Sequence, residues 1–151
     1  NMVEIGAPEY TEEEREFAEK IQKSLDPKLV EGEMRKFGES TDEEMYIYEG
    51  VLDKDKADTV MVAGSSDSGD VSWIMPMNLF LTATWPLGVP AHSWQATASS
   101  GSPMGQKAML YAAEILSGMM YDILNDPSIA KEAVEEFNER TKKQKYVSPL
   151  G

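Results

Sequence analysis

One long segment limits most strongly what this chain can fold into: residues 102–124, "SPMGQKAMLYAAEILSGMMYDIL". Ser102 followed by Pro103 supplies an N-cap and a proline at the first helical position, which predicts a helix from residue 102 to about residue 124. Most of the surface of this helix is apolar, and a helix that is apolar over more than half of its circumference is packed inside a domain. The other elements of the chain are too few to cover it, so the chain looks like part of a larger domain.

Capping signals predict further helices on either side. Thr11 is a suitable N-cap with Glu14 at the capping-box position, and an apolar stripe follows at fourfold spacing. That stripe consists of Phe17, Ile21 and Leu25. Pro27 either follows this helix or starts a short second one, and residues 31–44 indicate a polar loop. Asp126 and Pro127 repeat the cap-and-proline signal, which predicts a final amphipathic helix to about residue 143.

Short apolar stretches between these helices predict β-strands. They cover residues 45–51, 57–64, 71–76 and 79–85. In the last of them, alternate side chains fall on opposite faces, as in a strand. The order of a helix, several strands and two helices predicts an α/β fold.

Composition narrows the class of protein. The chain has 151 residues, about one domain, and a formal net charge of −13. That charge argues against binding to nucleic acid or to an anionic membrane surface, both of which require positive charge. No apolar run approaches the length of a membrane span, the start of the chain lacks the pattern of a signal peptide, and there is no cysteine. We therefore expect a cytoplasmic protein without disulfides or thiolate metal sites.

The first candidate site is the polar loop at residues 63–73, "AGSSDSGDVSW". It carries the carboxylates of Asp67 and Asp70 and the hydroxyl of Ser66, among other serines. A plainer interpretation is a turn in which Asp and Ser side chains bond their own backbone, and spacing alone favours that interpretation.

The second candidate site contains His92, the only histidine, within residues 88–101, "GVPAHSWQATASSG". One imidazole cannot form a metal site or a triad alone, so His92 is either a loop residue partly shielded by Trp94 or one member of a site completed elsewhere. If the strands predicted at 57–64 and 79–85 are parallel, both loops emerge at the same carboxyl edge of the sheet, where ligands bind in open α/β folds.

The two loops together carry a resemblance to a known family. "GSSDSGDVSWIMP" followed by "GVPAHSWQATA" resembles the aminobenzoyl-glutamate utilisation protein B group, amidohydrolase-like members of the dinuclear zinc exopeptidase family. The opening "GAPEYTEEEREFAEKIQ" and the closing "YVSPL" are also similar to that group. The resemblance implies that residues 1–151 are the C-terminal segment of a catalytic domain, with a mixed sheet flanked by helices. The N-terminal catalytic half and the lid and dimerisation domain are then missing from it.

The resemblance also implies a site and a reaction. His92 corresponds to the last zinc ligand, and Ser66, Asp67 and Asp70 would lie nearby to orient ligands or hold substrate. The full-length protein would hold two zinc ions, or manganese, and would hydrolyse the amide bond of an aminobenzoyl-glutamate-like or N-acyl amino acid substrate. The glutamate base is expected in the missing part, so this segment has no catalytic residue of its own. A homodimer or heterodimer is expected for the full-length protein.

One departure keeps other functions open. The group tends to show GHKGM at the start of the helix after HSWQ, whereas this chain has "GQKAM" with Gln106 in place of the histidine. An alternative is therefore a non-catalytic ligand-binding or partner subunit that keeps the fold. A third possibility is an acidic α/β interaction domain in which the motifs serve packing only.

Overall fold

The fold was analysed in a computed structural model, which describes residues 1–36, 45–52, 66–143 and 145–148. The chain divides into two compact units. Unit 1 comprises Asn1–Met61 and Thr82–Leu116, and unit 2 comprises Val62–Leu81 and Ser117–Gly151.

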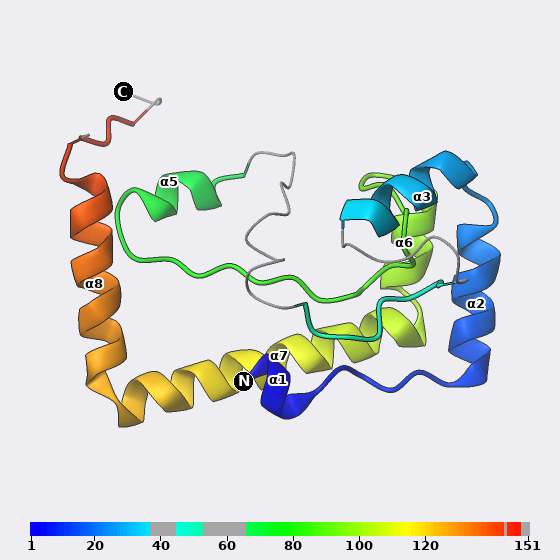
Figure 1. Ribbon diagram of the computed structural model, residues 1–151, viewed down its shortest axis with the longest axis horizontal. Coiled ribbons are helices and arrows are strands. Elements are labelled where there is room, and N and C mark those ends of the chain that lie inside the picture. Colours follow the sequence, from blue (N-terminus) through cyan, green and yellow to red (C-terminus); the bar gives the residue numbers. More distant parts are fainter. Residues whose placement is uncertain (37–44, 53–65, 144, 149–151) are drawn as a thin grey trace. The chain divides into compact units, whose positions relative to one another are not determined.

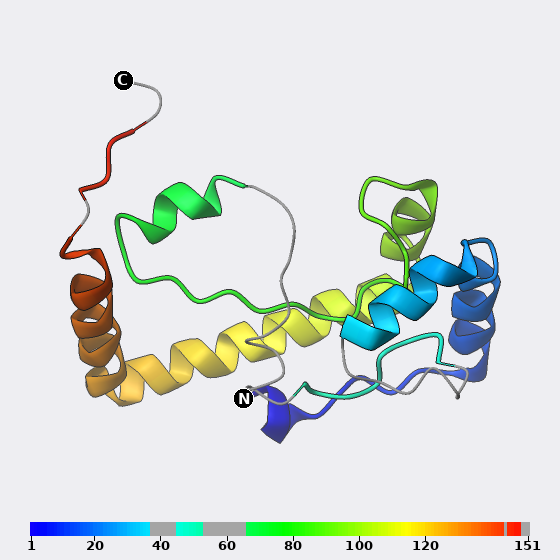
Figure 2. The same ribbon diagram turned by 45° about the horizontal axis from the view of Figure 1, so that its top comes forward.

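Unit 1 is built from helices joined by extended segments. Its helices are α1 (Met2–Ile5), α2 (Glu12–Gln22), α3 (Pro27–Lys36), α6 (Trp94–Ser100) and the first part of α7 (Pro103–Asn125). Both views show α2, α3 and α6 gathered around the N-terminal end of α7 (Figures 1 and 2).

The predicted capping signals are confirmed. The Glu14 backbone N–H donates to Thr11 Oγ1 at 3.3 Å and the Thr11 N–H donates to Glu14 Oε2 at 2.7 Å, which completes the capping box of α2. Ser102 Oγ accepts from the Gly105 N–H at 3.4 Å at the start of α7. These bonds satisfy backbone donors that have no partner inside the helix.

Pro27 starts a second helix rather than only ending the first. Asp26 Oδ1 accepts from the Lys28 backbone N–H at 2.9 Å, and α3 then continues to Lys36. The loop predicted at 31–44 is therefore wrong for residues 31–36, and residues 37–44 lie outside the described part of the chain. Met34, one turn after Val30, is buried, so an apolar spacing was present among the charges.

The core of unit 1 joins elements far apart in the sequence. Tyr10, Ala18, Ile47 and Met104 form a buried cluster against which Tyr46 and Ala83 pack. The Tyr10 hydroxyl donates to the Ala83 carbonyl at 3.2 Å. The segments that carry Tyr46 and Ala83 therefore pack against a core to which α2 contributes Ala18 and α7 contributes Met104.

A side-chain amide of α2 also connects the segments that carry Tyr46 and Ala83. Gln22 Nε2 donates to the carbonyls of Met45 and Leu87 at 2.9 and 3.1 Å. The Leu87 N–H donates to the Tyr46 carbonyl at 2.9 Å. Gly88 follows at φ 85°, where a Cβ atom would lie 2.8 Å from Val30 Cα, so only glycine fits this approach to α3.

Unit 2 contains α5 (Ser68–Ser72), the last turns of α7 and α8 (Pro127–Thr141). Asp126 caps α8, because its Oδ1 accepts from the Ser128 N–H at 3.0 Å and Pro127 occupies the first turn. The predicted final helix is confirmed. No side chain of α8 is fully buried.

The predicted α/β fold with a mixed sheet is wrong. The described residues contain helices but no strand. Residues 45–51 and 79–85 are irregular, residues 71–76 begin within α5, and the stretch 57–64 lies outside the described residues. The apolar alternation indicated an extended chain, but a strand also needs a neighbouring backbone. Leu79 and Leu81, for example, remain 71% and 67% exposed.

A search of the helices in the described part of the chain for one long and apolar enough to cross a membrane finds none.

Candidate functional site

His92 lies in unit 1, in the turn that leads into α6. The residue is exposed and has φ 62°, a backbone conformation that histidine adopts more readily than most residues but that is uncommon outside glycine. Ser93 holds the turn, because its Oγ donates to the Pro90 carbonyl at 2.7 Å and accepts from the Ala96 N–H at 3.1 Å. The imidazole is thus presented to solvent on the residue just before the N-cap of α6.

The helix α6 itself was not predicted. Its sequence "WQATASS" is rich in serine and threonine, which have low helix propensity. The signal that could have found it is Ser93, a good N-cap directly after a proline turn. Gln95 and Ala96 are buried, and Gln95 Nε2 donates to Ser24 Oγ at 3.2 Å, so tertiary contacts hold this helix in place.

The acidic loop lies in unit 2, where Asp67 precedes α5 and Asp70 lies inside it. Ser66 Oγ accepts from the Ser68 N–H at 3.2 Å, and the Asp67 carbonyl accepts from the Asp70 N–H at 3.0 Å. The Ser66 side chain therefore bonds the backbone of its own turn, whereas the Asp67 side chain makes no cap hydrogen bond to α5. The structure brings Ser66, Asp67 and Asp70 together within about one turn, and Ser66 and Asp70 are exposed.

Asp70 also meets the "YVSPL" motif. The Tyr146 hydroxyl donates to Asp70 Oδ1 at 2.6 Å, and this bond to the carboxylate raises the pKa of the Tyr146 phenol. A cleft of about 670 Å³ opens beside this contact. Its lining comprises Ser66, Gly69, Asp70, Ser72, Trp73, Lys145, Tyr146 and Val147. Two segments that carry the family resemblance are thus neighbours in space.

His92 and the acidic loop belong to different units, His92 to unit 1 and Ser66, Asp67 and Asp70 to unit 2. The expected meeting of the two loops depended on a shared sheet edge, and that argument is lost with the sheet.

The described residues do not form a metal site by themselves. Within residues 1–36, 45–52, 66–143 and 145–148, no three His, Asp or Glu side chains are grouped so that they could hold a metal ion. His92 offers one imidazole, which is a suitable zinc ligand, but zinc in proteins takes three or four protein donors. A zinc ion at His92 would need its other donors from outside the described residues.

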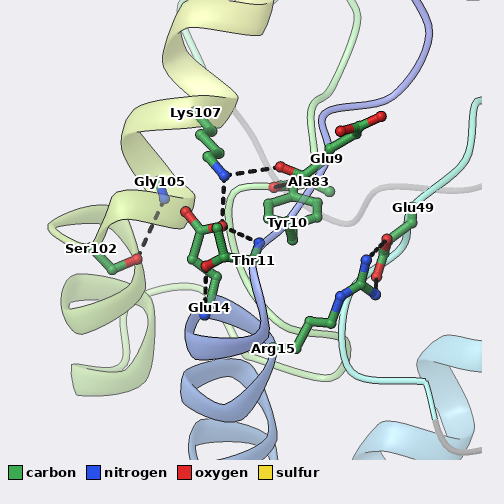
Figure 3. Close-up of polar contacts among 10 residues, drawn as sticks. All are labelled: Glu9, Tyr10, Thr11, Glu14, Arg15, Glu49, Ala83, Ser102, Gly105 and Lys107. Atoms are coloured by element: carbon green, nitrogen blue, oxygen red, sulfur yellow. Dashed lines mark hydrogen bonds and ion pairs between the residues drawn. The ribbon is translucent and has the colours of Figure 1, made fainter.

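The best-formed polar cluster of unit 1 surrounds Lys107, which sequence reasoning did not single out. Lys107 Nζ lies 2.6 Å from Glu14 Oε2 and donates to the Glu9 carbonyl at 2.9 Å (Figure 3). The same Glu14 carboxylate accepts from the Thr11 N–H, and the Lys107 ammonium lies 5.8 Å from the centre of the Tyr10 ring. One cation therefore ties the start of α7 to the start of α2.

Burial and charge have opposite effects on the pKa of Glu14. Burial raises it, but the hydrogen bond from Lys107, the Thr11 backbone bond and the positive charge of Lys107 lower it, and the result lies below the usual value. Burial, together with Glu49 and Glu14, raises the pKa of Tyr10 to about 12. Both groups therefore stay in one protonation state around neutral pH, which indicates a structural role rather than proton transfer.

The lysine of the "GQKAM" segment has a structural role in this cluster. Lys107 is the lysine of that segment, and it forms the ion pair just described. Gln106, which stands where the resembling group has histidine, is exposed on α7.

Comparison with curated proteins finds a p-aminobenzoyl-glutamate hydrolase subunit of Escherichia coli (strain K12), 28% identical over 156 aligned residues. The predicted resemblance is confirmed. The alignment covers 97% of this chain and 32% of the relative, so the chain spans about a third of that relative's length. No protein-family model matches the chain. No solved structure matches it either.

Proposed function

We propose that this chain is part of a metal-dependent hydrolase that cleaves the amide bond of an aminobenzoyl-glutamate-like or N-acyl amino acid substrate. The observation that carries the proposal is the alignment of 97% of the chain with a hydrolase subunit. Because that alignment covers nearly the whole chain, it includes the histidine motif and the acidic motif. The exposed imidazole of His92, held before α6 by the Ser93 bonds, supports the proposal.

In this proposal, His92 supplies one ligand to a divalent ion, zinc or manganese. A neutral imidazole suits either ion, and its second ring nitrogen is held by an acceptor in most metal sites. When bound, zinc polarises a carbonyl and lowers the pKa of its water. The chain's own contribution is to hold the imidazole at the start of α6 and to offer the Asp67 and Asp70 carboxylates and the Ser66 hydroxyl to substrate polar groups. The general base lies outside this chain.

The test uses the complete protein, purified without added metal, and its His92→Ala variant. We expect tightly bound zinc or manganese by elemental analysis, and release of p-aminobenzoate from p-aminobenzoyl-glutamate by fluorescence. In the variant both should fall at least tenfold, because a lost ligand typically costs well over 1.4 kcal/mol of binding free energy. Lys28→Gln, an exposed change on α3, is the matched control and should leave both unchanged. Equal metal content in His92→Ala and wild type would refute the ligand role.

A second candidate is a non-catalytic ligand-binding or partner subunit. Gln106, in place of the group's histidine, favours it. In that case the protein binds p-aminobenzoyl-glutamate, measured by calorimetry, without metal and without turnover.

A further inference from the structure

Trp94 presents an indole to solvent close to the proposed metal ligand. It is the first residue of α6, and its side chain is 63% exposed. His92, two positions earlier, is also exposed, and the Cα atoms of the two residues lie at most about 7 Å apart. Single exposed apolar side chains are common on protein surfaces, so what distinguishes Trp94 is its place beside the proposed ligand.

The helix that carries Trp94 is fixed to the rest of unit 1. Its buried residues are Gln95, Ala96 and Ser99. Gln95 Nε2 donates to Ser24 Oγ at 3.2 Å, just after the end of α2, and Trp85 Nε1 donates to Ser100 Oγ at 2.9 Å. An indole on a fixed helix offers a large, rigid contact surface at a low entropy cost, because only two side-chain torsions have to be ordered.

The two ends of the proposed substrate differ in chemistry. In p-aminobenzoyl-glutamate the aryl ring is bonded directly to the carbonyl carbon of the scissile amide, whereas the glutamate and its two carboxylates lie on the nitrogen side. The part of the substrate next to the amide carbonyl is therefore a flat ring, which packs favourably against an indole in stacked or edge-to-face contact. The carboxylates require polar or charged partners, which the face of an indole does not supply.

We infer that Trp94 contacts the aryl ring of the substrate, so that the hydrolase prefers N-aroyl amino acids to N-alkanoyl amino acids. This inference rests on the proposed function, and it selects one of the substrate classes named there. Trp94 is then a specificity residue, because it contacts the part of the substrate in which the two classes differ.

The first test compares two substrates in the complete protein and its Trp94→Leu variant. p-Aminobenzoyl-glutamate and N-acetyl-glutamate share the amide and the glutamate and differ in the acyl group. We expect wild type to have the higher kcat/KM on the aryl substrate. Trp94→Leu should lower the ratio of the two kcat/KM values by about tenfold, because the ring contact is lost for one substrate only. Trp94→Phe keeps a flat ring and should retain most of the preference.

The second test measures binding without turnover. p-Aminobenzoate carries the ring but no amide, so its Kd, measured by calorimetry on the complete protein, reports the ring contact directly. Trp94→Leu should raise this Kd by about fivefold or more, while the zinc or manganese content by elemental analysis stays unchanged.

A matched control uses an aromatic residue of similar exposure on another helix. Tyr121 on α7 is 68% exposed, and Tyr121→Leu should leave the ratio and the Kd unchanged. Circular dichroism checks the fold of each variant. Trp94→Gln, which places a polar side chain at the exposed position, is the second variant and should give the same losses as Trp94→Leu.

The outcomes separate the two proposals. Weaker p-aminobenzoate binding by the Trp94 variants, in a protein that hydrolyses neither substrate, would support the ring contact and contradict the hydrolase proposal. Hydrolysis of both substrates with an unchanged ratio would overturn the inference and leave the hydrolase proposal standing. An unchanged Kd, no binding of p-aminobenzoate by wild type, or an equal loss in Tyr121→Leu would also overturn it, because Trp94 would then have no specific contact with the ring.

Discussion

The ion pair between Lys107 and Glu14 makes a strong prediction about stability. Glu14 is 8% exposed and Lys107 is 35% exposed, so replacing Lys107 by methionine leaves a buried carboxylate whose remaining partner among the described residues is the Thr11 N–H. Removing one partner of a fully buried pair costs about 3–5 kcal/mol. Because water reaches the ammonium, we reduce this to about 2 kcal/mol for Lys107→Met.

The double variant isolates the pair. Glu14→Gln removes the charge with little change of shape, so Glu14→Gln/Lys107→Met should cost about 1 kcal/mol less than the sum of the single variants. The measurement is urea unfolding followed by circular dichroism at pH 7. The matched control is Lys20→Met, which breaks an exposed pair with Glu16 on α2 and should have no measurable effect.

The pH dependence gives an independent check. The folded pKa of Glu14 lies below its ordinary value of 4.5, so the stability from the pair is fully present above that unfolded value. It is lost as the pH falls through the lower folded value, because protonation removes the charge. The difference between wild type and Lys107→Met should therefore shrink below about pH 4. Equal unfolding free energies at pH 7, or additive single variants, would refute the reasoning.

Two further predictions concern close packing in unit 1. Gly88→Ala should lower the unfolding free energy by about 2 kcal/mol, because φ is 85° and the new Cβ atom would meet Val30; Gly69→Ala, where no atom lies within 4 Å, should not. A Gly88→Ala protein as stable as wild type in urea would contradict the packing described. Ser99 Oγ is buried without a hydrogen-bond partner among the described residues. Ser99→Ala should therefore raise the free energy of unfolding by about 1 kcal/mol, and with it the melting temperature. Ser102→Ala, which removes the cap of α7, should lower it, and the opposite order of the two variants would exclude this account.

Local signals in the sequence predicted the helices well. The Thr11 and Glu14 box, the Ser102–Pro103 pair and the Asp126–Pro127 pair each act on backbone groups within three residues, so one short stretch contains the whole cause. These signals placed the starts of α2, α7 and α8.

The predicted strands were wrong because strand formation depends on a pairing partner elsewhere in the chain. An alternating segment such as residues 79–85 becomes a strand only if another backbone pairs with it, and the described residues supply no such neighbour. The Lys107–Glu14 pair was missed for the same reason, since its members lie 93 positions apart and a single sequence does not show which charges meet. The sequence identified His92, Asp67 and Asp70 as candidates from their chemistry, but the distances between them depend on the fold.

The backbone at position 92 has a consequence for stability. Glycine at φ 62° would relieve strain in the turn before α6, and asparagine would tolerate it almost as well. Under the proposed function, the imidazole costs some stability in this turn and supplies a metal ligand in return. His92→Gly should therefore raise the free energy of unfolding and, under the proposed function, abolish metal binding.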